Sequence, residues 1–382
     1  MTTLPEVDTG PAYAVDITSP SIQPAIAPSG LGAVETRWVP ADDWRRIGSE
    51  WADFARRASA NAFLAPAFAL AAADVDAAKG LGVLVVTRDG AWIGLVAGRR
   101  TMMGAVFSVW THDYAPYGAP LVVPGEEPVV LAALFRHLAA ERIAALDWPM
   151  LDDGDLSCAL AAVAAGRRID VRDTHSRAVV RQALPALSKD HRRLLRRLGE
   201  QGDLRLSSTA DGDDPAAALA AFLALEVQGW KGRRGTALSA RPQTRRLVEV
   251  GIGELLRSGQ ARIDSLSLDG RPIAAGVVLM AGERAWYWKT AYDEAVSRFS
   301  PGVLLSHAIG SAVIAVPGLR LVDSCAIAGH PMIDRIWPER MSVTSRFIAV
   351  TEGAPGWRYL AALAVRRALT EGKALAKRLL KR

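Results

Sequence analysis

Residues 286–307 combine chemically useful side chains with a change of backbone pattern. They read WYWKTAYDEAVSRFSPGVLLSH: an alternating aromatic run, a polar loop, and an apolar helical pattern that begins after Ser300-Pro301-Gly302. The first N–H groups of a helix lack partners inside it, and the helix dipole favours an anion there. The stretch is therefore typical of a phosphate-binding loop, or of an ordinary strand-to-helix connection with Pro near its first helical position.

Lys289, Tyr292 and Asp293 lie at the end of the aromatic run. A Lys among aromatic strand residues needs a partner if it is buried, which favours a functional role for this group. In the alternative interpretation, Lys289 alternates outward to solvent and Tyr292 caps the core.

A second group precedes this stretch in the sequence. Glu226 and Trp230 are four residues apart, so they share one face of a predicted helix that ends near Lys231. They could line a pocket with Glu226 as a base. Equally, Trp230 could be a core anchor while Glu226 pairs with Lys231 or Arg233 at the surface.

A third group follows it. Asp323 ends a predicted strand, and His330 precedes a short helix that Pro331 opens. A His near neutral pKa, oriented by a carboxylate, is a candidate general base. Equally, His330 could only cap that helix. The six histidines include no HxxxH or HxH spacing, so we predict no metal site.

The elements that must position these residues occur twice in the same order. Each half reads as strand, two helices, three strands, helix, strand, helix and strand. The halves span residues 33–183 and 204–352, and a connector over residues 184–203 carries a basic helix that Ser188 can cap. This repetition predicts an α/β protein of two similar tandem domains with mixed central sheets.

Composition and charge limit the class of protein. The chain has 382 residues, half of them apolar, which is enough for two cores. Residues 1–32 lack the basic start and apolar core of a secretory signal and are predicted to be a disordered leader. Cys158 and Cys325 are the only thiols, which suits a reducing cytoplasm and excludes a disulfide scaffold.

Residues 353–382 are predicted to be a basic amphipathic tail helix. From Trp357 onward there are eight Lys or Arg and one acid, a net +7, so the rest of the chain carries −1 of the total of +6. Nothing outside the tail indicates a nucleic-acid-binding face. The apolar stripe is Trp357, Leu360, Ala364, Ala368, Leu375 and Leu379. It fits partial packing on the domain, which we favour, or peripheral contact with the inner face of an anionic membrane.

No GxGxxG or GxxxxGK[ST] follows a strand, so neither a Rossmann nor a P-loop site is supported. The element order is that of the GNAT acyltransferase fold. Four sequence segments strengthen the likeness: LEVQGWKGRRGTAL (225–238), DGRPIA (269–274), WYWKTAYDEAVSRFSPGVLL (286–305) and DSCAIAGHPMIDRIWPER (323–340). Together they resemble the CelD-like acetyltransferase family of the GNAT superfamily, which is related to the FemAB-like tandem transferases. The turn NAFLAP (61–66) is similar to the NPFLSP start of these proteins.

The resemblance implies an acyl-CoA-dependent N- or O-acyltransferase in which the acceptor attacks the thioester directly, with acetyl-CoA as co-substrate and no metal. It places the pyrophosphate at the loop after the fourth strand of the second half. The implied cofactor residues are Ser297, Arg298, Phe299, Ser300, Pro301, Gly302, Val303 and Leu304. The loop departs from the usual Q/R-x-x-G-x-G/A pattern, because it offers one Arg and one Gly, and its Pro has no N–H.

Direct attack needs a proton acceptor and donors to the oxyanion. The predicted catalytic residues are Tyr292, which could protonate the leaving thiolate, and Asp323 and His330. The predicted acceptor-binding residues are Glu226, Trp230, Lys231, Lys289 and Asp293. The acceptor would bind in the cleft facing the first half.

The resemblance implies a small-molecule or saccharide acceptor, such as a polysaccharide precursor. One alternative is a FemAB-like aminoacyl-tRNA-dependent transferase, which requires a basic tRNA-binding surface that the net charge of −1 outside the tail does not favour. The other is a non-catalytic GNAT scaffold held at a membrane synthase by the tail. The oligomeric state is left open.

Overall fold

The computed structural model of the protein describes residues 32–76 and 79–379, with side chains of the last helix described as far as Gly372. The leader predicted over residues 1–32 lies outside these ranges except for Gly32. Within them, no helix is both long and apolar enough to cross a bilayer.

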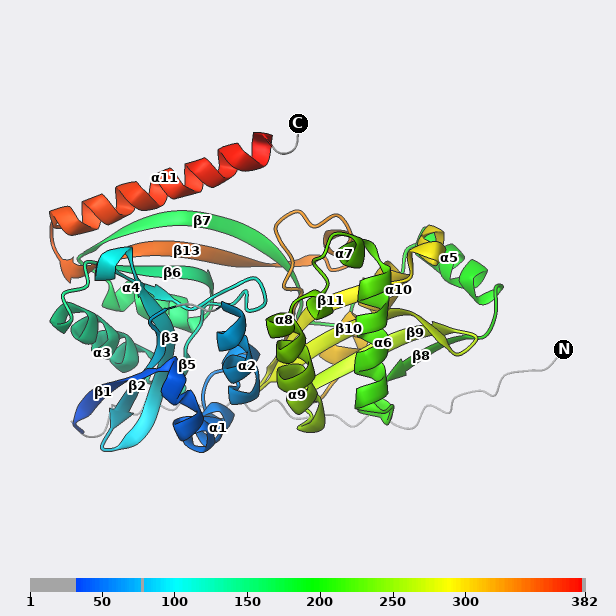
Figure 1. The fold of residues 1–382 in the computed structure, drawn as a ribbon, viewed down its shortest axis with the longest axis horizontal. Coiled ribbons are helices and arrows are strands. Elements are labelled where there is room, and N and C mark those ends of the chain that lie inside the picture. Colours follow the sequence, from blue (N-terminus) through cyan, green and yellow to red (C-terminus); the bar gives the residue numbers. More distant parts are fainter. Residues whose placement is uncertain (1–31, 77–78, 380–382) are drawn as a thin grey trace, which may run out of the picture.

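One mixed sheet of 13 strands runs through both halves (Figure 1). Its order is β1-β2-β3-β4-β6-β13-β7-β12-β11-β10-β9-β8, and β5 pairs with β3 beside this path. The strands are β1 (Val34–Pro40), β2 (Leu81–Arg88), β3 (Ala91–Thr101), β4 (Val106–Val109), β5 (Leu121–Val122), β6 (Ala145–Asp152), β7 (Arg167–Val180), β8 (Leu204–Ser208), β9 (Ala261–Leu268), β10 (Arg271–Ala281), β11 (Arg284–Tyr292), β12 (Leu321–Asp323) and β13 (Glu339–Glu352).

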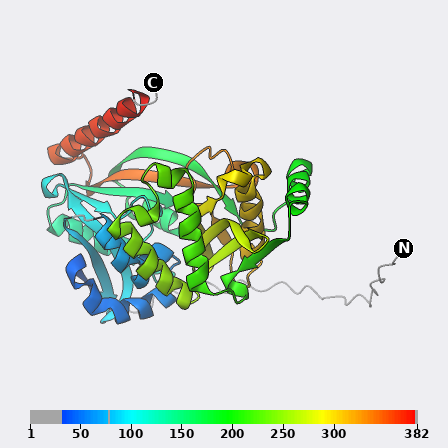
Figure 2. The ribbon, with the colours of Figure 1, turned by 45° about the vertical axis from the view of Figure 1, so that its right-hand side comes forward.

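Helices cover both faces of this sheet (Figure 2). The α-helices are α1 (Gly48–Arg57), α2 (Pro66–Asp76), α3 (Glu127–Ala140), α4 (Asp155–Val163), α5 (Lys189–Gly199), α6 (Pro215–Gln228), α7 (Trp230–Arg233), α8 (Pro242–Arg246), α9 (Gly253–Arg257), α10 (Pro301–Ile314) and α11 (Trp357–Leu379). A π-helical stretch, η6 (Leu247–Ile252), joins α8 to α9, and a 3₁₀ helix, η7 (Glu294–Phe299), precedes α10.

Local sequence explains most of these elements. The hairpins β2–β3 and β9–β10 turn at Asp89-Gly90 and Asp269-Gly270, where both residues of each pair have positive φ, as a two-residue turn requires. Ser188 caps α5 by accepting from the His191 N–H at 3.2 Å. The predicted tandem α/β plan with mixed sheets is confirmed.

The central strands connect the two halves in a way that the linear domain plan does not describe. β13 of the second half pairs with β6 and β7 of the first, and β7 of the first half pairs with β12 of the second. The order is therefore symmetric about the β13·β7 pair, and the parallel pair β4·β6 corresponds to β11·β12. The boundaries 33–183 and 204–352 stay a prediction, but neither half of the sheet is complete without a strand from the other.

The core is also shared. On one face of β11, Trp286 and Trp288 pack against Phe63 and Phe68 of the first half, with ring centroids 5.7 and 6.0 Å apart. On the other face, Tyr287 belongs to a second core beneath α10. Since β11 is buried on both faces, its position is fixed from two sides.

Candidate active site

The parallel strands β11 and β12 separate after a few paired residues, and we call the place where they separate the opening. These parallel strands pair over three positions only, and their last pair is Trp286 with Asp323. β12 ends there, whereas β11 continues to Tyr292. Among the described residues, no strand pairs with β11 on this side beyond Trp286.

A bulge re-aims the side chains at this opening. Val277 pairs with Lys289 and Val278 pairs with Tyr287, so Trp288 is the extra residue on β11. Bulges commonly occur beside active sites because they redirect a side chain. The Lys289 Nζ lies 5.6 Å from the centre of the Trp288 ring and 5.0 Å from that of Tyr114.

The corresponding opening of the first half is filled by the chain itself. β4 and β6 also pair over three positions, ending at Ser108 with Asp147. Beyond them, the Gly118 N–H donates to the Met150 carbonyl at 3.0 Å, and the Trp148 Nε1–H donates to the Gly118 carbonyl at 2.8 Å. A Cβ at position 118 would lie 1.9 Å from a backbone oxygen, so the loop fits closely here.

The same loop forms a wall of the second-half opening. The Trp288 Nε1–H donates to the Tyr114 carbonyl at 2.8 Å. Further along the loop, the hydroxyl of Tyr117 contacts Arg284. The first half therefore supplies part of the site that the second half opens, and sequence reasoning missed both tyrosines.

His112, on this loop, was also missed by sequence reasoning. Its Nδ1 accepts from the Tyr114 N–H at 3.3 Å, so the neutral ring carries its proton on Nε2. Among the described residues, the buried Nε2 has no hydrogen-bond partner. Burial lowers the pKa of His112 to about 4, so the ring is neutral at neutral pH.

Lys289 forms no ion pair with any residue in the described part of the chain. Burial, and then the positive charge of Lys231, lower the pKa of Lys289, while Glu226 raises it by a smaller amount. The Lys289 amine lies against two aromatic rings, and its role at the site stays a prediction.

Glu226 and Lys231 form a buried pair beside β11. The Glu226 Oε1 accepts from the Lys231 Nζ at 2.7 Å, and the Oε2 accepts from the Leu238 N–H at 2.7 Å. The Lys231 Nζ also donates to the Thr290 carbonyl at 3.2 Å. Both carboxylate oxygens are thus engaged, as in our alternative interpretation of Glu226, although the pair is buried instead of lying at the surface.

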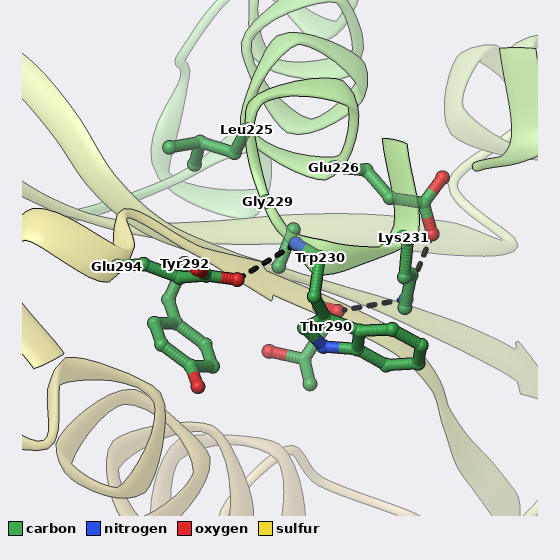
Figure 3. Close-up of a pocket in the computed structure, with 9 residues that line it drawn as sticks. Leu225, Glu226, Gly229, Trp230, Lys231, Thr290, Tyr292 and Glu294 are labelled. Atoms are coloured by element: carbon green, nitrogen blue, oxygen red, sulfur yellow. Dashed lines mark hydrogen bonds and ion pairs between the residues drawn. The ribbon is translucent and has the colours of Figure 1, made fainter. Parts of the chain in front are cut away.

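Trp230 does not share a helix face with Glu226, so that expectation is wrong. α6 ends at Gln228 because Gly229 adopts an extended conformation, and α7 begins at Trp230. The Trp230 side chain is 45% exposed, so it is not a core anchor. It lies at a small pocket whose other side is formed by the Tyr292 ring (Figure 3).

Three predicted residues are held by structural partners. The Asp323 carboxylate accepts from Arg177 at 3.0 Å and from the Cys325 N–H at 2.8 Å. The His330 Nδ1 accepts from the Ile333 N–H at 3.3 Å, as a cap would. Asp293 caps η7 through the Ala295 N–H and pairs with Arg271 at 3.0 Å. Their predicted roles at the site remain predictions.

The N-terminus of α10 offers few groups to a phosphate. The N–H groups of Val303 and Leu304 both donate to the Ser300 carbonyl, and Ser300 has a φ of 53°. Since Pro301 has no N–H, the Gly302 N–H is the remaining donor of this turn. Ser297 and Arg298 are exposed in η7, whereas Phe299 and the Leu304 side chain belong to the core beneath α10. The groups of this turn that are left for a phosphate are the Gly302 N–H and the exposed Arg298 guanidinium.

Among the described residues, no group of three or more His, Cys, Asp or Glu side chains could hold a metal ion.

The comparisons with known proteins agree with this geometry. Residues 185–329 match the family described as acetyltransferase (GNAT) domain, a family that generally uses acyl-CoA. This stretch includes α10, β11 and the opening, but it is less than half of the chain. No curated protein matches the chain in sequence.

Solved structures extend the likeness to both halves. One is the C-terminal domain assigned to a lysylphosphatidylglycerol synthetase of Agrobacterium fabrum, with 12% identity, a TM-score of 0.53, and coverage of 85% of this chain and 97% of that one. L-PGS from Bacillus licheniformis has 12% identity, a TM-score of 0.51, and coverage of 83% and 96%. FemX has 12% identity, a TM-score of 0.50, and coverage of 82% and 96%. At such identities these structures show a shared fold only.

As predicted, the chain has a GNAT-type fold, and the match of residues 185–329 to the GNAT acetyltransferase domain supports an acyltransferase. Membership of the CelD-like branch stays a prediction.

Proposed function

We propose that this protein transfers an acyl group from acyl-CoA, with acetyl-CoA as the first candidate, to an amine or hydroxyl of a small-molecule or saccharide acceptor. The observation that supports this most is the unpaired edge of β11 beyond Trp286. An extended amide-containing chain can add to such an edge through main-chain hydrogen bonds. Acyl-CoA has such an arm, and it supplies the acyl group already activated as a thioester.

The donor would lie with its phosphates at the Gly302 N–H and at Arg298, and with its arm along β11 toward Lys289. Tyr292 separates these two regions and packs against Gly302, where a Cβ would lie 3.2 Å from its ring. This position supports Tyr292 as the donor of a proton to the leaving thiolate.

Lys289 is our candidate for the group that takes the proton of the acceptor. An amine can do so only when it is neutral, and the lowered pKa of Lys289 increases its neutral fraction. Asp323, His330 and Glu226 are weaker candidates. The oxygen or nitrogen atoms with which these side chains would take a proton already accept hydrogen bonds from other groups of the protein.

The acceptor would enter between the halves, where Tyr114 and Lys289 meet, or along the pocket beside Trp230. Exposed aromatic rings such as that of Trp230 provide flat apolar surfaces on which a sugar ring can stack. This feature supports a saccharide acceptor.

Binding of acetyl-CoA to the full chain, measured by calorimetry, tests the proposal. Gly302→Trp would block the turn, and Arg298→Glu would reverse the charge beside it. Arg197→Glu on the exposed face of α5 is the matched control for charge. We expect the two loop variants to bind at least about tenfold more weakly, since a charge-assisted hydrogen bond contributes roughly 1.5–3 kcal/mol. No binding by the unaltered chain at millimolar acetyl-CoA, or equal affinity for all variants, would refute it.

The role of Lys289 has its own test. Competitive labelling of amines with acetic anhydride over a pH series reports the neutral fraction of each lysine by peptide mass spectrometry. Lys289 should titrate below the ordinary value of 10.5. Acetyl-CoA should slow the labelling of Lys289 but not that of the exposed Lys189. Titration of Lys289 at or above 10.5 would remove it as the proton acceptor.

A second candidate function is transfer of an aminoacyl group from aminoacyl-tRNA. The full-length likeness to L-PGS and FemX favours it, and the net charge of −1 outside the tail counts against it. Binding of tRNA without binding of acetyl-CoA would select this function.

A further inference from the structure

The last helix, α11, is attached to the sheet by buried apolar residues and by two arginines. Its buried residues Tyr359, Ala362 and Leu363 face β13, where the Tyr359 ring lies 5.3 Å from that of Phe347. The Tyr359 hydroxyl donates to Asp170 at 2.8 Å.

Two arginines of α11 extend this attachment. Arg366 contacts the buried Asp147, and the Arg367 guanidinium lies 3.2 Å from the Asp170 carboxylate. These two arginines of the helix thus bind carboxylates of the sheet on the inner side and flank of α11.

The outer side of α11 is apolar. Trp357 is 77% exposed, Leu360 48%, Val365 50% and Leu369 52%. Successive helical residues are about 100° apart, so Trp357 lies opposite the buried side, Leu360 and Val365 lie on the two flanks of the outer side, and Leu369 lies beside the buried Ala362. The exposed residues Ala361, Ala364 and Ala368 complete the same stripe. A helix on a protein surface normally presents a polar side to water, whereas most of the outer side of this part of α11 is apolar.

A continuous apolar stripe has a different meaning from scattered exposed apolar residues. Single exposed leucines are ordinary, whereas a contiguous patch indicates a surface that binds another molecule. α11 runs along the first half above β7 and β13 (Figure 1). In the same view α7, which begins at Trp230, lies toward the upper side of the second half.

The net charge of residues 357–382 indicates which kind of partner α11 would bind. Residues 357–382 contain eight Lys or Arg and one acid, while the rest of the chain sums to −1. An anionic lipid surface complements both properties, because apolar side chains enter the acyl boundary while basic residues meet the headgroups. A second copy of this chain would bring another net +7 to the same contact, and like charges repel.

We propose that α11 docks the protein on an anionic membrane surface, with Trp357, Leu360 and Val365 inserted at the boundary between headgroups and acyl chains. This inference does not depend on which acyl donor the site uses.

Co-sedimentation of the full chain with lipid vesicles tests the docking. Vesicles that contain phosphatidylglycerol are compared with vesicles of phosphatidylcholine alone, at low and high salt. We expect binding to the anionic vesicles that weakens with salt. A chain that stays in solution with both kinds of vesicle, or that binds both equally, overturns the proposal.

Substitutions distinguish membrane binding by the apolar stripe of α11 from non-specific hydrophobic binding by other parts of the surface. Trp357→Ser with Leu360→Ser should weaken binding by roughly tenfold or more, because two large apolar side chains no longer enter the lipid. Met103→Ser is the control, since Met103 is fully exposed and lies outside α11. Circular dichroism melts should be unchanged in both variants. Equal vesicle binding by both variants would overturn the proposal, as would a dimer in solution that only the α11 variant converts to monomers.

Discussion

Asp323→Asn is expected to weaken the fold far more than the chemistry. The Asp323 side chain is fully buried and that of Arg177 is 2% exposed, with 3.0 Å between their nitrogen and oxygen atoms. The other acceptor of this guanidinium nitrogen is the Pro116 carbonyl, also at 3.0 Å. The neutral amide therefore leaves a buried guanidinium without a counter-charge in direct contact.

The magnitude follows from this burial. Removing one partner of a buried ion pair costs about 3–5 kcal/mol. Asn still provides an oxygen to the Cys325 N–H, so we expect the lower end of this range. The control is Asp43→Asn, whose pair with Arg46 is exposed and should contribute about 0–1 kcal/mol.

Urea unfolding followed by circular dichroism measures the free-energy change. Affinity for acetyl-CoA, measured well below the unfolding transition, should change little. The double variant Arg177→Met with Asp323→Leu should recover most of the lost stability, because an apolar pair can replace a buried ion pair. Unchanged stability together with a large loss of transfer activity would refute this reasoning and make Asp323 catalytic.

Three further predictions concern the loop and the pair beside β11. His112→Gln should remove an acid-sensitive part of the stability: the pKa of His112 is about 4 in the fold against an ordinary 6.5. The unaltered chain should therefore lose up to about 3 kcal/mol between these pH values that the variant does not, as unfolding at each pH would show. Gly118→Ala should lower the melting temperature, because its Cβ would meet a backbone oxygen, whereas Gly356→Ala has open space and should not. Lys231→Met should raise the pKa of Lys289 in the labelling assay, because the Lys231 charge lowers it; an unchanged or lower value would mean that the two amines do not interact.

The sequence is sufficient to predict the order of elements and the fold class. Hairpin turns, helix caps and apolar periodicity are local signals, and they predict nearly every strand and helix. The exchange of β7 and β13 between the halves could not be predicted. Each is a single strand whose pattern carries no information about its neighbours, and the pairing joins residues that are far apart in the chain.

The residues of the candidate site also differ in whether their proximity could be predicted from the sequence. Lys289, Tyr292 and the turn at Gly302 lie within one stretch, so their proximity followed from the sequence. His112 and Tyr114 come from the other half, and Tyr114 lies 174 residues before Trp288, to which it is hydrogen-bonded. The prediction that Glu226 and Trp230 share one helix face failed because the pattern did not show that Gly229 interrupts the helix.

The central claim is that the donor binds in the opening of the second half, between β11 and β12, and not in the corresponding place of the first half. Hydrogen–deuterium exchange of the full chain, with and without acetyl-CoA, tests it directly. We predict slower exchange on addition of acetyl-CoA in peptides that cover residues 287–305, and no change in residues 106–110, where the loop fills the corresponding opening. Protection of residues 106–110 without protection of residues 287–305 would contradict the account.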